Sequence, residues 1–121
     1  MVGVGKMKRE ILRRMHELLS FGWCQNIFAQ NADGRSVMVQ DPAACQWCLG
    51  GALRLALIEK HKGGAGLEVG YGPLSEEGRL RGWCVSFLSE LESLGGWNDD
   101  RARTQAEVLA FVELLLTFAD E

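Results

Sequence analysis

Residues 41–60 read DPAACQWCLGGALRLALIEK, and the middle of this stretch is apolar on nearly every side of a helix. Asp41 followed by Pro42 predicts a helix start, because an Asp side chain caps free N–H groups and proline suits the first helical position. The helix is expected to run to the end of the stretch and to form the buried centre of the fold. Gly50 and Gly51 weaken such a helix by about 1 kcal/mol each relative to alanine. Their presence predicts that a neighbouring backbone or a ligand approaches closely there.

The part of the chain before this stretch predicts one helix and one hairpin. Apolar residues recur at helical spacing between residues 4 and 20, and Gly22 is expected to end that helix. Residues 23–30 and 36–40 flank an Asn-Ala-Asp-Gly segment, and an Asp-Gly pair between apolar segments is a hairpin-turn signal. We therefore expect a small β-hairpin formed by these two arms.

The part after it predicts two more helices. Ser75 is expected to cap a long third helix whose apolar stripe continues to Leu94, with Gly95 and Gly96 ending it. Thr104 and Glu107 have the spacing of a capping box, which predicts the start of the last helix.

These elements predict a mainly α (α+β) fold. The expectation is one globular domain over residues 1–121, with four helices and one small β-hairpin near residues 23–40. Residues 63–73 contain five glycines and are expected to form a loop.

Composition excludes several classes of protein. The chain has 121 residues, 47% of them hydrophobic, which disfavours a disordered protein. It carries 13 Lys and Arg against 16 Asp and Glu, which disfavours nucleic-acid binding, so the basic run at residues 6–14 is interpreted as a solvated face. Neither a secretory signal nor a membrane-spanning segment is predicted, and we expect a cytoplasmic protein with reduced thiols.

The cysteines allow three interpretations. Cys45 and Cys48 form a C-x-x-C motif that, with Cys24 and Cys84, contains enough thiolates for a zinc site. Packing as small hydrophobic side chains is the favoured interpretation, and a redox role is disfavoured because the βαβ context of thioredoxin-like proteins is missing. We expect no metal, no cofactor and no enzymatic activity, since no nucleophile and histidine stand at motif spacing.

The junction at residues 97–104 carries the densest chemistry in the chain. Trp97 offers a stacking face, Asn98 and Asp100 offer polar groups that read the edges of a ligand, and Arg103 offers a fork for phosphate. The residues expected to bind a nucleotide-like ligand, including one on the pocket floor and a second stacking tryptophan, are Trp97, Asn98, Asp100, Arg103, Phe87 and Trp23. The alternative is structural, with Trp97 plugging the end of the helix bundle.

Several of these motifs resemble an uncharacterised bacterial and phage domain family. The resemblance rests on Trp23-Cys24-Gln25, on Asp41-Pro42-Ala43 leading to Trp47-Cys48-Leu49-Gly50-Gly51, and on Trp97-Asn98-Asp99 followed by Arg103-Thr104. It implies no reaction. A looser similarity of size and site chemistry connects the chain with phage anti-defence sponge proteins of the Thoeris-inhibiting kind, which are small, oligomeric and sequester cyclic nucleotide signals.

We therefore expect a non-catalytic protein that sequesters a nucleotide-like signal, of cyclic ADP-ribose or cyclic oligonucleotide type, as a homo-oligomer. Two alternatives stay open: a structural or protein-interaction module whose Trp and Cys residues are all core, and a structural zinc module.

Overall fold

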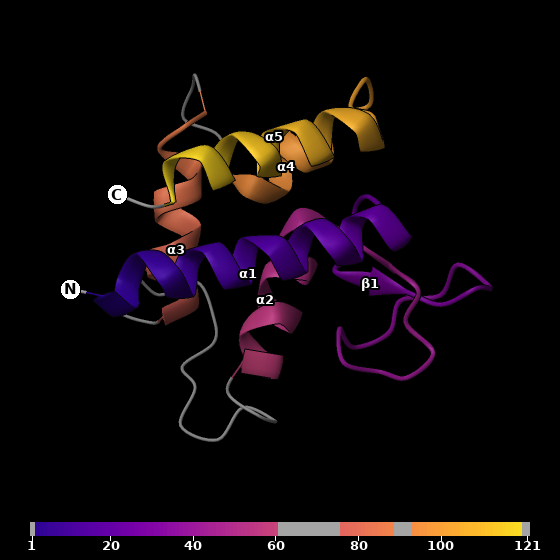
Figure 1. The fold of residues 1–121 in the computed structure, drawn as a ribbon. Helices are drawn as coiled ribbons and strands as arrows, with labels where there is room; N and C mark the ends of the chain where they lie inside the picture. Colours follow the sequence, from indigo (N-terminus) through magenta and orange to yellow (C-terminus); the bar gives the residue numbers. More distant parts are fainter. Residues whose placement is uncertain (1, 61–75, 89–92, 120–121) are drawn as a thin grey trace.

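A computed structural model describes residues 2–60, 76–88 and 93–119, and the chain is mainly helical within them (Figure 1). The elements in chain order are α1 (Val2–Phe21), β1 (Ala29–Gln30), β2 (Gln46–Trp47), α2 (Leu49–Lys60), α3 (Glu76–Val85), α4 (Leu94–Asn98) and α5 (Gln105–Phe118). The predicted fold class is confirmed, with five helices in the described residues where the sequence predicted four. The expected loop at residues 63–73 and the cap at Ser75 lie outside the described residues.

Three helices enclose the core. α1 packs against both α2 and α5, so the first and last helices lie side by side (Figure 1). Ile11 and Met15 on α1, Leu53 on α2, and Val112 and Leu115 on α5 are at most 1% exposed. The apolar spacing thus predicted the buried face of α1 correctly between residues 11 and 19.

Charged side chains join α1 and α2 along their solvent-facing sides. The Arg14 guanidinium donates from Nε to Glu59 Oε1 at 2.6 Å, and this bond raises the pKa of Arg14. Lys60 forms an ion pair with Glu10. Part of the predicted basic face is therefore used in exposed contacts between two helices.

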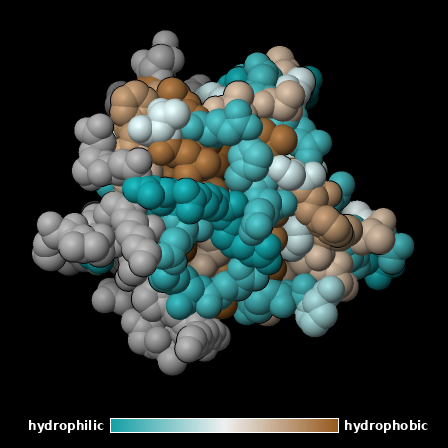
Figure 2. Space-filling view, viewed as in Figure 1, coloured by the Kyte–Doolittle hydropathy of each residue, from teal (hydrophilic) through white to brown (hydrophobic). Residues whose placement is uncertain are grey.

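Two large apolar side chains of α5 are exposed outside its buried stripe, although exposed Glu113 and Thr117 lie next to them. Leu114 and Phe118 are 44% and 43% exposed. Figure 2 shows hydrophilic side chains over the front of α1 and hydrophobic ones over α5 beside it. Among the described residues, no helix combines the length and apolarity needed to cross a membrane.

The hairpin pairs differently from the prediction. β1 pairs antiparallel with β2, placing Ala29 opposite Trp47, whereas the expected arms meet only at the single bridge between Gln30 and Ser36. The predicted turn is present, because Gly34 has φ +79° and its N–H donates to the Asn31 carbonyl at 3.0 Å. The turn chemistry was local and predictable, but the strand partner comes from farther along the chain.

The predicted start of the central helix was wrong. Asp41 Oδ1 accepts the N–H of Ala43 at 2.7 Å, yet this cap-like bond closes a turn and α2 begins only at Leu49. The intervening N–H groups are donated elsewhere: Cys45 to the Gln30 carbonyl at 3.0 Å and Cys48 to the Phe28 carbonyl at 3.2 Å.

The third predicted helix is shorter than expected, and a fourth begins where it should have ended. α3 stops at Val85, and Ser93 then caps α4 by accepting the Gly96 N–H on its Oγ at 2.9 Å. Gly95 and Gly96 therefore lie inside α4 instead of ending a helix, and the presumed connector begins as helix.

The capping box before α5 is confirmed. Glu107 N–H donates to Thr104 Oγ1 at 3.2 Å, and Thr104 N–H donates back to Glu107 Oε1 at 2.9 Å. These reciprocal bonds satisfy two N–H groups at the helix start.

Candidate functional site

Residues 22–48 connect α1 to α2, and we call this segment the lobe. Its two ends run side by side: Trp47 N–H donates to the Gly22 carbonyl, and Cys24 N–H donates to the Trp47 carbonyl, both at 3.1 Å. This pattern is a parallel bridge between Trp23 and Trp47. The lobe is therefore closed at its base, next to the start of α2.

Asn98, at the end of α4, joins the base of the lobe to two helices and is fully buried. Its Oδ1 accepts from Trp23 Nε1 at 2.8 Å and from the Leu49 N–H at 3.1 Å. Its Nδ2 donates to the Cys24 carbonyl at 3.1 Å and to Asp99 Oδ1 at 2.9 Å. These four bonds use both acceptor positions and both donor hydrogens of the side chain. The amide is thus occupied by the protein itself.

Asn26 redirects the chain toward α2. Its φ of 73° lies in the left-handed region, which asparagine tolerates better than most residues, and its N–H donates to Asp99 Oδ1 at 2.8 Å. The following residues pass so close to α2 that a Cβ on Gly51 would overlap the Phe28 carbonyl oxygen. The predicted close backbone approach is present at Gly51, whereas the atoms nearest to Gly50 belong to the side chains of Arg81 and Phe28.

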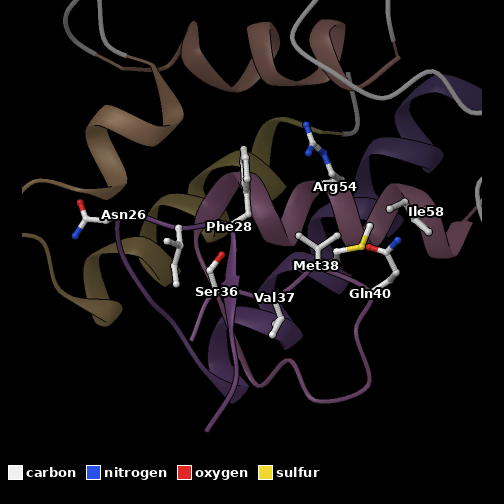
Figure 3. A pocket seen from close by; sticks show the side chains of 10 residues that line it. Asn26, Phe28, Ser36, Val37, Met38, Gln40, Arg54 and Ile58 are labelled. Atoms are coloured by element: carbon white, nitrogen blue, oxygen red, sulfur yellow. The ribbon is translucent and has the colours of Figure 1, made fainter. Parts of the chain in front are cut away.

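A pocket of about 550 Å³ lies between the lobe and α2, and we call it the lobe pocket. The residues that line it are Asn26, Ile27, Phe28, Ser36, Val37, Met38, Val39, Gln40, Arg54 and Ile58. Figure 3 shows Met38, Gln40 and Ile58 close together at one end and Asn26 at the other. Most of the lining is apolar, with amide, hydroxyl and guanidinium groups at separate points.

One wall of the lobe pocket is held in place by ion pairs to the buried carboxylate of Glu77. The Arg54 guanidinium lies 4.8 Å from the centre of the Phe28 ring, and its Nε donates to Glu77 Oε1 at 3.1 Å. Glu77 on α3 is fully buried and also accepts from Arg81 Nη2 at 2.5 Å. A carboxylate between two guanidiniums therefore connects α3 to the pocket wall and orients Arg54 beside an aromatic face.

Trp97 and Arg103, predicted to bind a ligand, contact each other. The Arg103 guanidinium lies 3.9 Å from the Trp97 ring, and its Nε donates to the Trp97 carbonyl at 3.0 Å. The Trp97 ring also packs against Phe111 at 4.8 Å between centroids. Both side chains are half-buried and engaged within the junction.

The other predicted residues are distributed between two places. Asp100 is exposed, and its Oδ1 accepts the Ala102 N–H at 2.9 Å, which shapes the turn before α5. Phe87 packs against Trp83 and Phe118, with centroids 5.1 and 5.2 Å apart, near the far end of α5. The structure thus brings Trp23 to Asn98 and Trp97 to Arg103, while none of the six predicted residues lines the lobe pocket.

Three of the four cysteines are buried, and Cys45 is half-buried. None of the four forms a disulfide. Burial raises the pKa of Cys24 and of Cys84 to about 12. Burial also raises the pKa of Cys48. Within the described ranges, no three His, Cys, Asp or Glu side chains gather in a way that would hold a metal ion. The packing interpretation of Cys48 and Cys84 agrees with their exposures of 6% and 0%.

Sequence reasoning missed the lobe pocket, although one signal pointed to it. Gly50 and Gly51 indicated a close approach to α2, but the approaching segment, with Phe28 at its centre, follows only from the tertiary fold. Met38 and Gln40 lie in a turn, closed by the Asp41 N–H donating to the Met38 carbonyl, and this turn carries no sequence motif.

Comparison with known proteins identifies a family but no activity. No curated protein and no solved structure matches the chain. A family model described as a family of unknown function, DUF6197, matches residues 6–114. The matched range includes the whole lobe, α2, and the junction before α5. The chain therefore belongs to the family of unknown function DUF6197.

Proposed function

We propose that the protein is a non-catalytic binding protein that holds a small nucleotide-like ligand in the lobe pocket. The observation that carries this proposal is a pocket of about 550 Å³ with a mainly apolar lining and a few polar groups. Ligand sites in proteins have this character and volumes of roughly 300–1,000 Å³.

The lining suits the parts of a nucleotide. A flat base would lie against Phe28 and Met38, and the carboxamide of Gln40 would pair with its polar edge. Arg54 at the wall would meet a phosphate, for which its planar guanidinium is well suited. The proposal keeps the ligand class predicted from sequence and moves its site from the junction to the lobe pocket.

The junction then serves as the frame of the site. Asn98 and Asp99 hold the base of the lobe and the left-handed turn at Asn26, which is itself part of the pocket lining. Asn98, which the sequence predicted to contact the ligand, would therefore support binding indirectly by positioning the lobe.

A binder without turnover acts by lowering the free concentration of its ligand. We propose sequestration of a cyclic ADP-ribose-type or cyclic oligonucleotide signal in the cytoplasm, the role that the similarity to anti-defence sponge proteins implies. A homo-oligomer belongs to the proposal, because a chain of 121 residues covers more of a ligand when copies share the site. Light scattering of the purified protein measures the mass of the particle in solution. A monomer both with and without ligand would rule out the homo-oligomer.

Calorimetric titration with cyclic ADP-ribose isomers and cyclic dinucleotides tests the binding proposal. Met38 is 68% exposed and Gln40 is exposed, so Met38→Asp and Gln40→Ala should change the pocket while leaving the fold intact. We expect each to weaken binding at least tenfold, which corresponds to about 1.4 kcal/mol. The added carboxylate of Met38→Asp also repels phosphate.

Leu114→Ala is the matched control, since Leu114 is an exposed apolar residue on α5 outside the lobe pocket. It should bind like the wild type. Arg103→Ala separates the two candidate sites, because it changes the junction and leaves the pocket lining intact. Absence of binding by the wild type, or binding unaffected by Met38→Asp, would overturn the proposal.

A structural or protein-interaction module is the second candidate. The observation that favours it is the engagement of tryptophan side chains inside the protein: Trp23 Nε1 bonds to Asn98 and Trp47 Nε1 donates to the Val39 carbonyl at 3.1 Å. This candidate predicts that a folded wild type binds none of the nucleotides in the same titrations.

A further inference from the structure

Cys24 and Cys48 are neighbours across the base of the lobe. The parallel bridge pairs Trp23 with Trp47, so the next residues along both segments, Cys24 and Cys48, stand side by side. Paired segments lie about 4.8 Å apart. That separation falls within the roughly 4.4–6.8 Å between Cα atoms that a disulfide bridges.

The two sulfur atoms face the same piece of chain. Cys24 Sγ donates to the Ile27 carbonyl at 3.6 Å, while Cys48 Sγ accepts the Gly51 N–H at 3.3 Å. Gly51 in turn lies against the carbonyl of Phe28, the residue after Ile27. Each thiol therefore bonds to one of two segments, residues 27–28 and the first turn of α2, and these two segments touch at the Phe28 carbonyl.

Cys45, the other cysteine of the C-x-x-C motif, is less well placed than Cys24 to form a disulfide with Cys48. Gln46 and Trp47 are the extended residues of β2 between Cys45 and Cys48. Three residue steps along a strand separate the ends by about 10 Å, and an odd number of steps sends side chains to opposite faces. A disulfide does not span that distance without movement of the backbone.

A second, smaller pocket gives access to Cys48. This pocket of about 220 Å³ is lined by Cys48 together with Asn26, Ile27, Phe28, Gly95 and Asp99. It shares the wall at residues 26–28 with the lobe pocket. A molecule as small as hydrogen peroxide fits this volume and meets Cys48 at the start of α2.

We propose that Cys48 and Cys24 are a peroxide-reactive pair that forms a reversible disulfide across the base of the lobe. The Cys48 thiolate attacks one peroxide oxygen, the O–O bond breaks, and hydroxide leaves, so that the sulfur becomes a sulfenic acid. The Cys24 thiol then attacks that sulfur, forming the S–S bond and releasing water. The two thiols lose two electrons in total, which the peroxide accepts, and a small-molecule thiol returns them by exchange.

The disulfide would lock the lobe onto α2. It closes a loop that runs from Cys24 to Cys48 and contains both the turn at Gly34 and most of the lobe pocket lining. Burial raises the pKa of both thiols, so oxidation is expected to be slow at neutral pH. This inference concerns thiol chemistry and does not depend on the proposed ligand.

The test is treatment of the folded wild-type protein with hydrogen peroxide, followed by intact mass measurement and peptide mapping without reduction. We expect the loss of two hydrogen atoms and one cross-linked peptide that contains Cys24 and Cys48, both reversed by a small-molecule thiol. Cys24→Ser and Cys48→Ser should abolish the cross-link completely, whereas the matched variants Cys45→Ser and Cys84→Ser should keep it.

Circular dichroism before and after treatment checks that each variant is folded. A cross-link between Cys45 and Cys48, or sulfinic acid on Cys48 with no cross-link, would overturn the pairing. A folded wild type whose thiols all survive peroxide would overturn the reactivity as well.

Discussion

Asn98 accepts or donates hydrogen bonds at every polar position of its side chain. Its chemistry was recognised from sequence, because an amide that both donates and accepts is typical of recognition sites. Its partners were not predictable, since Trp23 and Leu49 are 75 and 49 residues away. Whether such an amide binds a ligand or the chain itself is decided by long-range packing, which local sequence does not encode.

We expect Asn98→Ala to be strongly destabilising. It leaves buried groups of Trp23, Leu49 and Cys24 without their partners, and the cost should be roughly 3 kcal/mol of the free energy of unfolding. Urea denaturation followed by tryptophan fluorescence measures this cost.

Asn31→Ala is the control, because Asn31 also accepts two backbone N–H groups, but in an exposed turn. Its cost should stay below about 1 kcal/mol. Equal losses for the two variants would show that the Asn98 network contributes little.

At the scale of elements, prediction succeeded where the signals were local. The apolar spacing of α1 and the capping box of α5 depend on residues a few positions apart, and both are present. Asp41 also forms its local bond, but Cys45 and Cys48 donate the N–H groups that a helix would have used to the carbonyls of Gln30 and Phe28. The lobe pocket was missed for the same reason, because its walls meet only after that pairing.

Two glycines, both in helices, should respond oppositely to alanine. Gly51→Ala places a Cβ against the Phe28 carbonyl, which must move, so we expect a loss of about 3 kcal/mol in unfolding free energy. Gly82 in α3 is exposed and has nothing within 4 Å of the added Cβ. Gly82→Ala should therefore gain up to about 1 kcal/mol from helix propensity.

Thermal unfolding of both variants in one buffer makes the comparison. A Gly51→Ala protein as stable as the wild type would contradict the close contact between α2 and the lobe.

At the scale of the whole molecule, the fold keeps buried thiols protonated. The pKa of Cys84 rises from its ordinary 9.0 to about 12 through burial, so the unfolded chain ionises first as the pH increases. The stabilising effect is complete below pH 9 and is lost as the pH rises from 9 towards 12. Cys84 alone should lower the free energy of unfolding by about 1.4 kcal/mol per pH unit within that window.

Denaturation midpoints measured across this alkaline range test the expectation. Cys84→Ala removes one thiol, so the slope of stability against pH should be shallower than in the wild type. Parallel slopes would indicate that Cys84 ionises in the folded protein as readily as in the unfolded chain.

The pairing of the first helix with the last also bears on how the protein is made. Ribosomes synthesise a chain from its N-terminus, so α1, the lobe and α2 leave the ribosome before α4 and α5 have been made. Until then Trp23 and Leu49 lack Asn98, and the apolar face of α1 lacks α5. A nascent or truncated chain therefore exposes aggregation-prone surface, and the molecule completes its core only after translation reaches the final helix.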